Sequence, residues 1–460
     1  MFIRFWIAFY CVAILAADRI LREQKSFLDT LGTNPGSIIE QFRPNLSDFE
    51  DAYRYIHQHP ELSCKELQTA TYIEGELEKI GLKTHNKVGG HGVVGILENG
   101  PGSIIMLRSE LDALPIREQT GLPYASKESM EDIWGRAQPV MHACGHDMHM
   151  ACLLAACKLL SNAKSSWSGT LIAIFQPNEE HTGGAQAMVD DGLYDLIPVP
   201  DVVFAQHSLA IKTGMVSIKA GPVLVSAETM SIRLFASVGF PANPQLTIDP
   251  VVVSARILVQ LESLAARIAG DDYASVGVQE IHAGQPGEDF VAFVDIILDV
   301  KAYNPSVRQD LVVAIQDLVE FESKSAGIKI PPEITTKLRA PTTNNSKELV
   351  QTLLPAFTQF FGADMVLDRV PKHPCEDFSL LASSKGVPYV FWFLGRVDPV
   401  EWERSERMGN SLETVPIEHS PFNAPVVYLT LKTGTDALSL AALSFFQETE
   451  LLGKQLAHLG

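Results

Sequence analysis

A short motif rich in histidine and cysteine, together with polar residues further along the chain, is the part of the sequence best suited to chemistry. The motif Met-His-Ala-Cys-Gly-His-Asp-Met-His contains Cys144 and His146, and it is followed by the pair Glu179-Glu180 and by His207. Thiolate, imidazole and carboxylate groups are the ligands that zinc-like divalent ions take in proteins. Two adjacent glutamates allow one carboxylate to bind metal while the other moves protons. The sequence therefore predicts a catalytic metal site.

The candidate ligands follow short apolar runs that are typical of buried strands. These runs occupy residues 104–107, 171–175 and 202–205. In open α/β sheets, ligands bind outside the carboxyl ends of the strands, so residues far apart in sequence are expected to meet there. An Ala- and Leu-rich segment at 150–160 predicts a helix that begins directly after the Cys-Gly-His turn. The N-terminus of this helix would favour a thiolate.

Further motifs occur in a fixed order along nearly the whole chain beyond about residue 45. They read HQHPEL at 57–62, LDALP at 111–115, QPNEE at 176–180, MVDDGL at 188–193, EDFS at 376–379 and EHSP at 418–421. In this order and spacing they resemble the metallopeptidase family of aminoacylases and carboxypeptidases. The branch that they resemble contains hippurate hydrolase, N-acetyl-amino-acid deacetylases and plant auxin-conjugate hydrolases.

The resemblance implies roles for individual residues. Five positions match the family's metal ligands, and they are Cys144, His146, Glu180, His207 and His419. Glu179 matches its general base and acid. Two divalent ions are implied, and such a pair polarises a scissile carbonyl while the glutamate carries the proton of the attacking water to the leaving nitrogen. Zinc is the default ion, with manganese, cobalt or nickel as alternatives because geometry alone does not fix the metal.

Other polar residues of these motifs are expected to support the site. Asp147 would orient a ligand histidine or cap the following helix. Asp112 and the pair Glu376-Asp377 would hydrogen-bond loops near the site. His142 and His149 match no ligand position, so we expect them around the ligands or at the surface, with direct coordination as the alternative.

Residues 223–339 carry the pattern of a separate domain. The periodicity predicts strands near 230–234, 275–281, 293–303 and 333–338, and helices at 250–268 and 307–326. The order β-α-β-β-α-β is the split βαβ arrangement, with two helices on one face of a four-stranded antiparallel sheet. The fold class is therefore α/β: a mixed-sheet di-metal hydrolase domain, formed by residues 45–222 and 340–460, with an inserted α+β domain. The resemblance implies that this insert is a lid, joined by hinges near 221–222 and 340–341, and that it forms a homodimer.

The insert departs from the family where substrate is expected. Phe240 stands in place of the family's lid histidine. Glu288 stands near the position where the family has an asparagine, and Lys301 stands where an arginine is common. Glu288 would repel a substrate carboxylate, and loss of an oxyanion donor costs about 2.7–4 kcal/mol. We therefore predict that simple acetyl- or benzoyl-amino acids are poor substrates and that the preferred one is bulkier, more apolar near Phe240, or lacks a carboxylate beside the scissile amide. The alternative is that Phe240 merely packs the lid. Outside the insert, Glu110 replaces the family's usual aspartate, and its longer side chain could displace a contact beside the site.

Composition and charge narrow the class of protein. With 46% hydrophobic residues among 460, the chain can form the cores of two or three domains. A net charge of -19 without a basic stripe argues against a nucleic-acid partner. The six cysteines do not have the pattern of a disulfide framework.

Residues 1–17 have the charge, length and order of a signal peptide. Arg4 precedes an apolar run that ends at Ala17, and the run is too short for a comfortable membrane span. Cleavage would send the protein into the secretory route. An uncleaved anchor, or a cytoplasmic protein with an N-terminal extension, is the alternative because Ile14 and Leu15 crowd the cleavage site.

These observations predict a metal-dependent amidohydrolase that cleaves an amide bond in an N-acyl amino acid or a small peptide-like conjugate. A pathway-specific tailoring hydrolase acting on an unusual amide is one alternative, and a protein that retains metal without turnover is another. Glu179 argues against the second alternative, because a pure binding site does not need a free carboxylate beside a metal-binding one.

Overall fold

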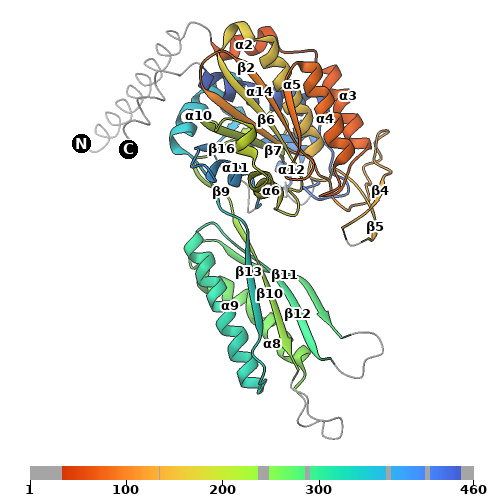
Figure 1. Ribbon diagram of the computed structural model, residues 1–460, viewed down its shortest axis with the longest axis vertical. Helices are drawn as coiled ribbons and strands as arrows, with labels where there is room; N and C mark the ends of the chain where they lie inside the picture. The colour runs from red at the N-terminus through yellow and green to blue at the C-terminus, as the bar shows by residue number, and fades with distance from the viewer. Residues whose placement is uncertain are drawn as a thin grey trace, which may run out of the picture.

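The computed structural model describes residues 34–133, 135–236, 248–284, 291–368, 374–409 and 415–446. The described chain forms a larger body from its first and last parts and a smaller body from its middle part (Figure 1). The candidate signal peptide, Phe240 and Glu288 lie outside the described residues, so the expectations about them stay predictions. No helix among the described residues has the length and apolar character needed to cross a membrane.

The larger body is built on an eight-stranded mixed sheet. Its strand order is β1 (Lys83–Val88), β2 (Gly92–Asn99), β6 (Gly169–Gln176), β3 (Ile104–Glu110), β7 (Val202–Lys212), β16 (Tyr389–Val397), β8 (Val216–Ser217) and β15 (Val366–Leu367). The central strands β6, β3, β7 and β16 are parallel. Strands β1 and β2 pair antiparallel to their neighbours, whereas β8 is antiparallel to β16 and parallel to β15. The predicted mixed sheet is therefore confirmed, and its parallel centre brings the carboxyl ends of three apolar strands to one edge.

Successive residues of the central strands point to opposite faces, and each face has its own core. Leu107, Phe175 and Phe204 pack on one side, and Met106 and Ile174 pack on the other. The first side is covered by α2 (Pro35–Phe42), α3 (Ser47–Gln58), α4 (Leu67–Ile80), α5 (His146–Asn162), α10 (Lys347–Phe361) and α14 (Val427–Phe446). The second side is covered by α6 (Gly184–Asp190), α7 (Leu193–Leu196) and α11 (Ser379–Ser383).

Helix α5 lies inside the larger body. It is buried nearly all round, as expected for a helix that is apolar on every face. The helix begins at His146, so it takes in the second half of the motif and not only the predicted segment 150–160. Gly145, immediately before it, has a φ of 87°, a left-handed conformation that glycine adopts without strain.

The smaller body has the predicted element order. Its elements are β10 (Ser226–Phe235), α8 (Pro250–Ala269), β11 (Ala274–Ala283), β12 (Phe293–Ala302), α9 (Pro305–Ala326) and β13 (Glu333–Ala340). The strands form one antiparallel sheet in the order β11-β12-β10-β13, and both helices pack on one face of it. Each helix starts with an N-cap side chain followed by proline, Asp249-Pro250 and Asn304-Pro305, as the sequence pattern indicates.

The two crossings between the bodies pair with each other. Strand β9 (Gly221–Leu224) and strand β14 (Thr343–Asn345) form a two-stranded antiparallel ribbon beside the predicted hinges. Asn345 fixes this ribbon to the larger body, because its side chain bonds the N–H and the carbonyl oxygen of Phe391 and the carbonyl oxygen of Lys219. The lid and dimerisation roles of the smaller body stay predictions. The remaining elements of the described residues are β4 (Ser129–Glu131), β5 (Ala137–Pro139), α12 (Pro399–Arg407) and two short 3-10 helices (Lys164–Ser166 and Ala363–Met365).

Candidate functional site

The predicted ligands meet at the carboxyl edge of the central strands. Cys144 lies in the turn before α5, and His146 is the first residue of that helix. Glu180 follows β6. His207 lies within β7 and not after it, because this strand extends beyond the predicted apolar run to Lys212. His419 comes from the last part of the chain, and its N–H donates to the carbonyl oxygen of Ala143, which ties its loop to the motif.

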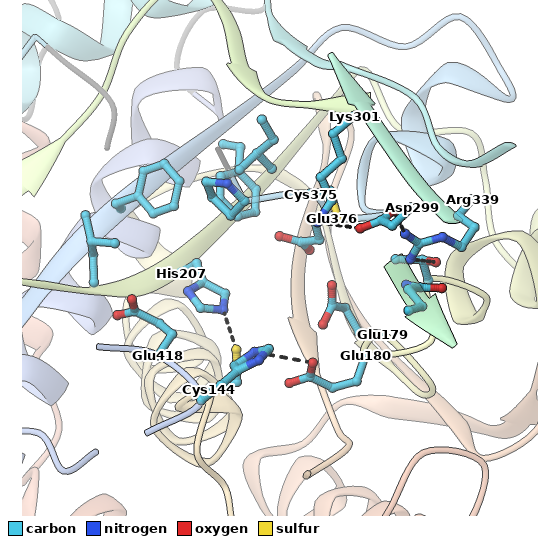
Figure 2. A pocket seen from close by; sticks show the side chains of 18 residues that line it. Cys144, Glu179, Glu180, His207, Asp299, Lys301, Arg339, Cys375, Glu376 and Glu418 are labelled. Carbon is cyan, nitrogen blue, oxygen red and sulfur yellow. Dashed lines mark hydrogen bonds and ion pairs between the residues drawn. The ribbon is translucent and has the colours of Figure 1, made fainter. Parts of the chain in front are cut away.

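The donor atoms form two groups that share one residue. The first group is Cys144, His146 and His207, and the second is Cys144, Glu180 and His419, with all donor atoms of a group within 4.8 Å of one another. The Cys144 Sγ atom lies 3.3 Å from His207 Nε2, and His419 Nε2 lies 3.5 Å from Glu180 Oε2. Figure 2 shows Cys144, Glu180 and His207 turned toward one another in the pocket. The Cys144 thiol therefore belongs to both candidate donor groups.

Hydrogen bonds to backbone carbonyls orient two of the imidazoles. His146 Nδ1 lies 2.8 Å from the Asp112 carbonyl oxygen, and His207 Nδ1 lies 2.7 Å from that of Ser208. A carbonyl oxygen only accepts, so each Nδ1 carries the proton and each Nε2 faces the site with a lone pair. Within the described chain, His146 Nε2 and Glu180 Oε1 are buried without a hydrogen-bond partner. Such orphaned buried acceptors fit a bound cation.

Glu179 occupies the same pocket but belongs to neither of these two groups. Its Oε2 atom lies 3.7 Å from His146 Nε2, close enough for these two residues and Glu180 to form a third possible cluster. Burial and the adjacent charge of Glu180 raise the pKa of Glu179 well above its ordinary value. Burial, followed by the charges of Glu180 and Glu179, likewise raises the pKa of the Cys144 thiol. Glu179 is thus a carboxyl group beside the candidate ligands that binds a proton more tightly than an ordinary glutamate does.

The site opens into a cavity of about 420 Å³ between the two bodies. The smaller body lines it with Gln279, Asp299, Lys301 and Arg339. Lys301 Nζ lies 2.8 Å from Asp299 Oδ2, and Arg339 forms an ion pair with the same carboxylate (Figure 2). Lys301 was predicted near substrate, but Arg339 was not. The alternation of apolar and polar residues along β12 indicates that Asp299 and Lys301 face away from the helices. No pattern in the sequence indicates that this face of the sheet lines the cavity.

Acidic residues around the ligands hold the loops as expected. Asp112 Oδ2 accepts from Ser63 Oγ at 2.7 Å and from the Glu180 N–H at 3.0 Å. Asp377 accepts from the Gln176 side chain at 2.6 Å and from the Ala185 N–H at 2.9 Å. These bonds connect both sides of the Glu179-Glu180 loop to residues that follow β3 and precede α11.

Three other expectations need correction or refinement. Asp147 accepts the N–H of Met148 in the first turn of α5, but it pairs with His57 and not with a ligand histidine. His142 and His149 are both buried, so the surface alternative is wrong for them. Glu110 reaches His149, with 2.9 Å between Oε2 and Nδ1, and it pairs with Arg108, which also binds Glu376. The longer side chain is therefore used within a buried network.

The chain is similar to a known protein family and to named members of it. The family model described as peptidase family M20/M25/M40 matches residues 106–409. Hippurate hydrolase of Campylobacter jejuni is 31% identical over 359 residues, covering 77% of this chain and 90% of the relative. IAA-amino acid hydrolase ILR1-like 2 of Arabidopsis thaliana is 31% identical over 349 residues, covering 75% of this chain and 76% of the relative.

A solved structure has the same arrangement of elements. The crystal structure described as that of an aminohydrolase from methicillin-resistant Staphylococcus aureus matches with a TM-score of 0.73 and 25% identity, covering 88% of this chain and 99% of the other. The resemblance of the motifs and the prediction of a hydrolase are confirmed by these matches. The chain belongs to peptidase family M20/M25/M40, and it is a metal-dependent amidohydrolase of that family.

Proposed function

We propose that the protein uses two divalent metal ions to hydrolyse an amide bond in an N-acyl amino acid or a small peptide-like conjugate. The observation that carries this proposal is the pair of donor groups that share Cys144, neither of which contains Glu179. Cys144, His146 and His207 would hold one ion, and Cys144, Glu180 and His419 the other. Sulfur and imidazole donors suit zinc, which we propose as the native metal.

The bound ions would supply electrostatic polarisation of the scissile carbonyl and of water. Glu179 performs the proton transfers: its carboxylate takes a proton from the attacking water and then donates it to the nitrogen that leaves. Its raised pKa suits the first step, because a carboxylate that holds a proton more tightly is the better base. Burial of the side chain limits its contact with bulk solvent.

The cavity has the size for a small substrate, and the smaller body places two cations in its lining. A volume of about 420 Å³ lies within the range of small-molecule sites. Lys301 and Arg339, which both pair with Asp299, offer ionic partners to a substrate carboxylate on the wall that the smaller body provides. The named substrates of hippurate hydrolase and IAA-amino acid hydrolase are acyl amino acids that carry such a group. Among the predicted substrates, these cations favour a bulkier acyl amino acid over one without a carboxylate.

Replacing Glu179 tests the proposed division of labour. We expect Glu179→Ala to retain the metal content of the wild-type protein, with activity lower by about 10²–10⁴-fold, because general acid–base catalysis contributes about that much. Elemental analysis and turnover of a panel of N-acyl amino acids measure the two quantities. Glu180→Ala, one position along the same loop, is the matched control and should lose metal. Metal loss in Glu179→Ala, or its full activity, would contradict the assignment.

The homodimer and the secretory route also belong to the proposal. Strand β11 is an edge of the smaller sheet, and its exposed side chains include Val278 and Ile281, which a second copy would cover. The molar mass in solution checks the dimer. N-terminal sequencing of protein from its own host checks cleavage near Ala17, which an intact Met1 on a soluble cytosolic protein would contradict.

A further inference from the structure

A chain of buried hydrogen bonds leads from Glu110 to the candidate ligand His207. Glu110 Oε2 lies 2.9 Å from His149 Nδ1, and the Ser208 N–H donates to His149 Nε2 at 2.8 Å. The carbonyl oxygen of Ser208 lies 2.7 Å from His207 Nδ1. Glu110, His149 and Ser208 are all at most 1% exposed. We propose that the Glu110–His149 pair positions His207 for metal binding through the backbone of Ser208. This inference rests on the proposed metal site.

The donors and acceptors fix the tautomer of His149. A backbone N–H only donates, so His149 Nε2 is unprotonated and accepts from Ser208. The ring proton is then on Nδ1, and the Glu110 carboxylate accepts it. Both ring nitrogens are engaged, so His149 is not a ligand, although its donor atoms lie within 4.8 Å of those of Glu110 and His146. With the opposite tautomer, two N–H groups would face each other at Ser208.

The Ser208 N–H needs the His149 acceptor because the neighbouring strand β3 does not provide an acceptor there. The residue pairing between β3 and β7 ends at Arg108 and Ala205, before the chain reaches His207. On the other side, β16 continues alongside to pair Leu394 with Ser208. A buried N–H without a partner is costly, so the His149 acceptor holds the open side of β7 in place where the strand carries the ligand.

The Glu110 carboxylate is itself held from behind. Arg108 Nη1 contacts Glu110 and also Glu376, and Arg108 Nε donates to the Gln176 side chain at 2.9 Å. These groups are all buried, so the carboxylate has little freedom to turn away from His149. Networks around metal-binding histidines of this kind orient the ring, and changes in them cost about 10–100-fold in metal affinity or activity.

Two substitutions of His149 separate the link to Ser208 from the link to Glu110. Asparagine places its amide near the position of Nδ1 and does not reach Ser208, whereas glutamine carries an acceptor near the position of Nε2. In the protein loaded with cobalt(II), we expect His149→Asn to bind one of the two ions about 10–100-fold more weakly and to shift its visible absorption spectrum. The other ion should keep its affinity. His149→Gln should recover most of the loss.

His142→Asn is the matched control. His142 is also buried and lies in the same motif, but within the described chain neither of its ring nitrogens has a hydrogen-bond partner. Its substitution should leave both cobalt affinities and the spectrum unchanged. Glu110→Gln keeps the shape of the side chain and removes its charge, so it is the second test should His149→Asn fail to fold; it should weaken the same ion.

The outcomes distinguish this inference from the proposed function. A wild-type protein that binds fewer than two ions overturns the proposed function. A wild-type protein that binds two ions, together with a folded His149→Asn whose affinities and spectrum match wild type, overturns only the positioning role. Equal losses in His142→Asn and His149→Asn would also overturn it, because the effect would then come from general disturbance of the motif.

Discussion

At the scale of single residues, the surroundings of the site depend on buried histidines held by carboxylates. His57 lies between two of them, with 2.6 Å from Nδ1 to Asp147 and 3.1 Å from Nε2 to Glu118. Burial alone would lower the pKa of His57, but the hydrogen bonds to Asp147 and then Glu118 raise it to about 9. His57 is therefore charged at neutral pH, and it joins α3 to the start of α5.

This raised pKa predicts a loss of stability in alkaline solution. A histidine whose pKa is higher in the folded state stabilises the protein fully below its unfolded pKa, near 6.5, and loses that contribution as the pH rises through about 9. The shift corresponds to a contribution on the order of 3 kcal/mol to the free energy of unfolding. We expect the melting temperature to fall between pH 7 and pH 10 by several degrees more in wild type than in His57→Gln. Equal falls in the two proteins would show that His57 carries no such stabilisation.

At the scale of elements, the position of the motif depends on close packing of α5 against α14. Gly434 of α14 faces α5 with no room for a side chain, since a Cβ atom there would lie 2.5 Å from Cys152 Sγ and 2.8 Å from Gln206 Nε2. Cys152 follows His146 by less than two turns on α5, and Gln206 directly precedes His207. The glycine thus allows one helix to approach both segments that carry candidate ligands.

We expect Gly434→Ala to lower the free energy of unfolding by about 1–3 kcal/mol, the usual cost of overpacking a core. Gly75→Ala in α4 is the matched control, because a Cβ atom there meets nothing within 4 Å. Alanine is a better helix former than glycine by about 1 kcal/mol, so this control should raise stability. Chemical denaturation of both variants measures the two changes. A stabilising Gly434→Ala would mean that the helices separate freely at this contact.

At the scale of the whole molecule, the substrate cavity depends on how the two bodies meet. Arg339 at the end of β13 pairs with Asp299, and its Nη1 atom also lies 3.4 Å from Thr182 Oγ1 in the loop after Glu179-Glu180. The guanidinium therefore touches both bodies at the cavity. The β9–β14 ribbon beside it forms the covalent connection.

Removing this cation should affect carboxylate recognition more than chemistry. We expect Arg339→Met to raise KM for an N-acyl amino acid by about 10–100-fold, since a hydrogen bond to a charged group contributes about 1.5–3 kcal/mol. The KM for the methyl ester of the same substrate should change little, and kcat should remain within a few fold. Steady-state kinetics on the acid and the ester measure this. Arg233→Met, an exposed ion pair with Asp295 on the same sheet, is the control. Equal changes in KM for the acid and the ester would contradict carboxylate binding by Arg339.

The sequence by itself determined the family, the class of reaction and most of the scaffold. The ligand types of Cys144, His146 and Glu180 are legible because the motif and the apolar strands around it are local patterns. The helices of the smaller body were equally predictable, since the N-cap and proline pairs at Asp249 and Asn304 mark their starts without help from the rest of the chain.

Only the tertiary structure decided which residues share a surface. The central strand order β6-β3-β7 brings Glu110 beside His149 and Ser208, and the ribbon between the bodies brings Arg339 to Thr182. These contacts join segments up to 157 residues apart. Sequence analysis could not predict them, because hydrophobic periodicity and secondary-structure propensity describe only neighbours along the chain. The shared place of Cys144 in two donor groups has the same origin, because it depends on His419 returning from the far end of the chain.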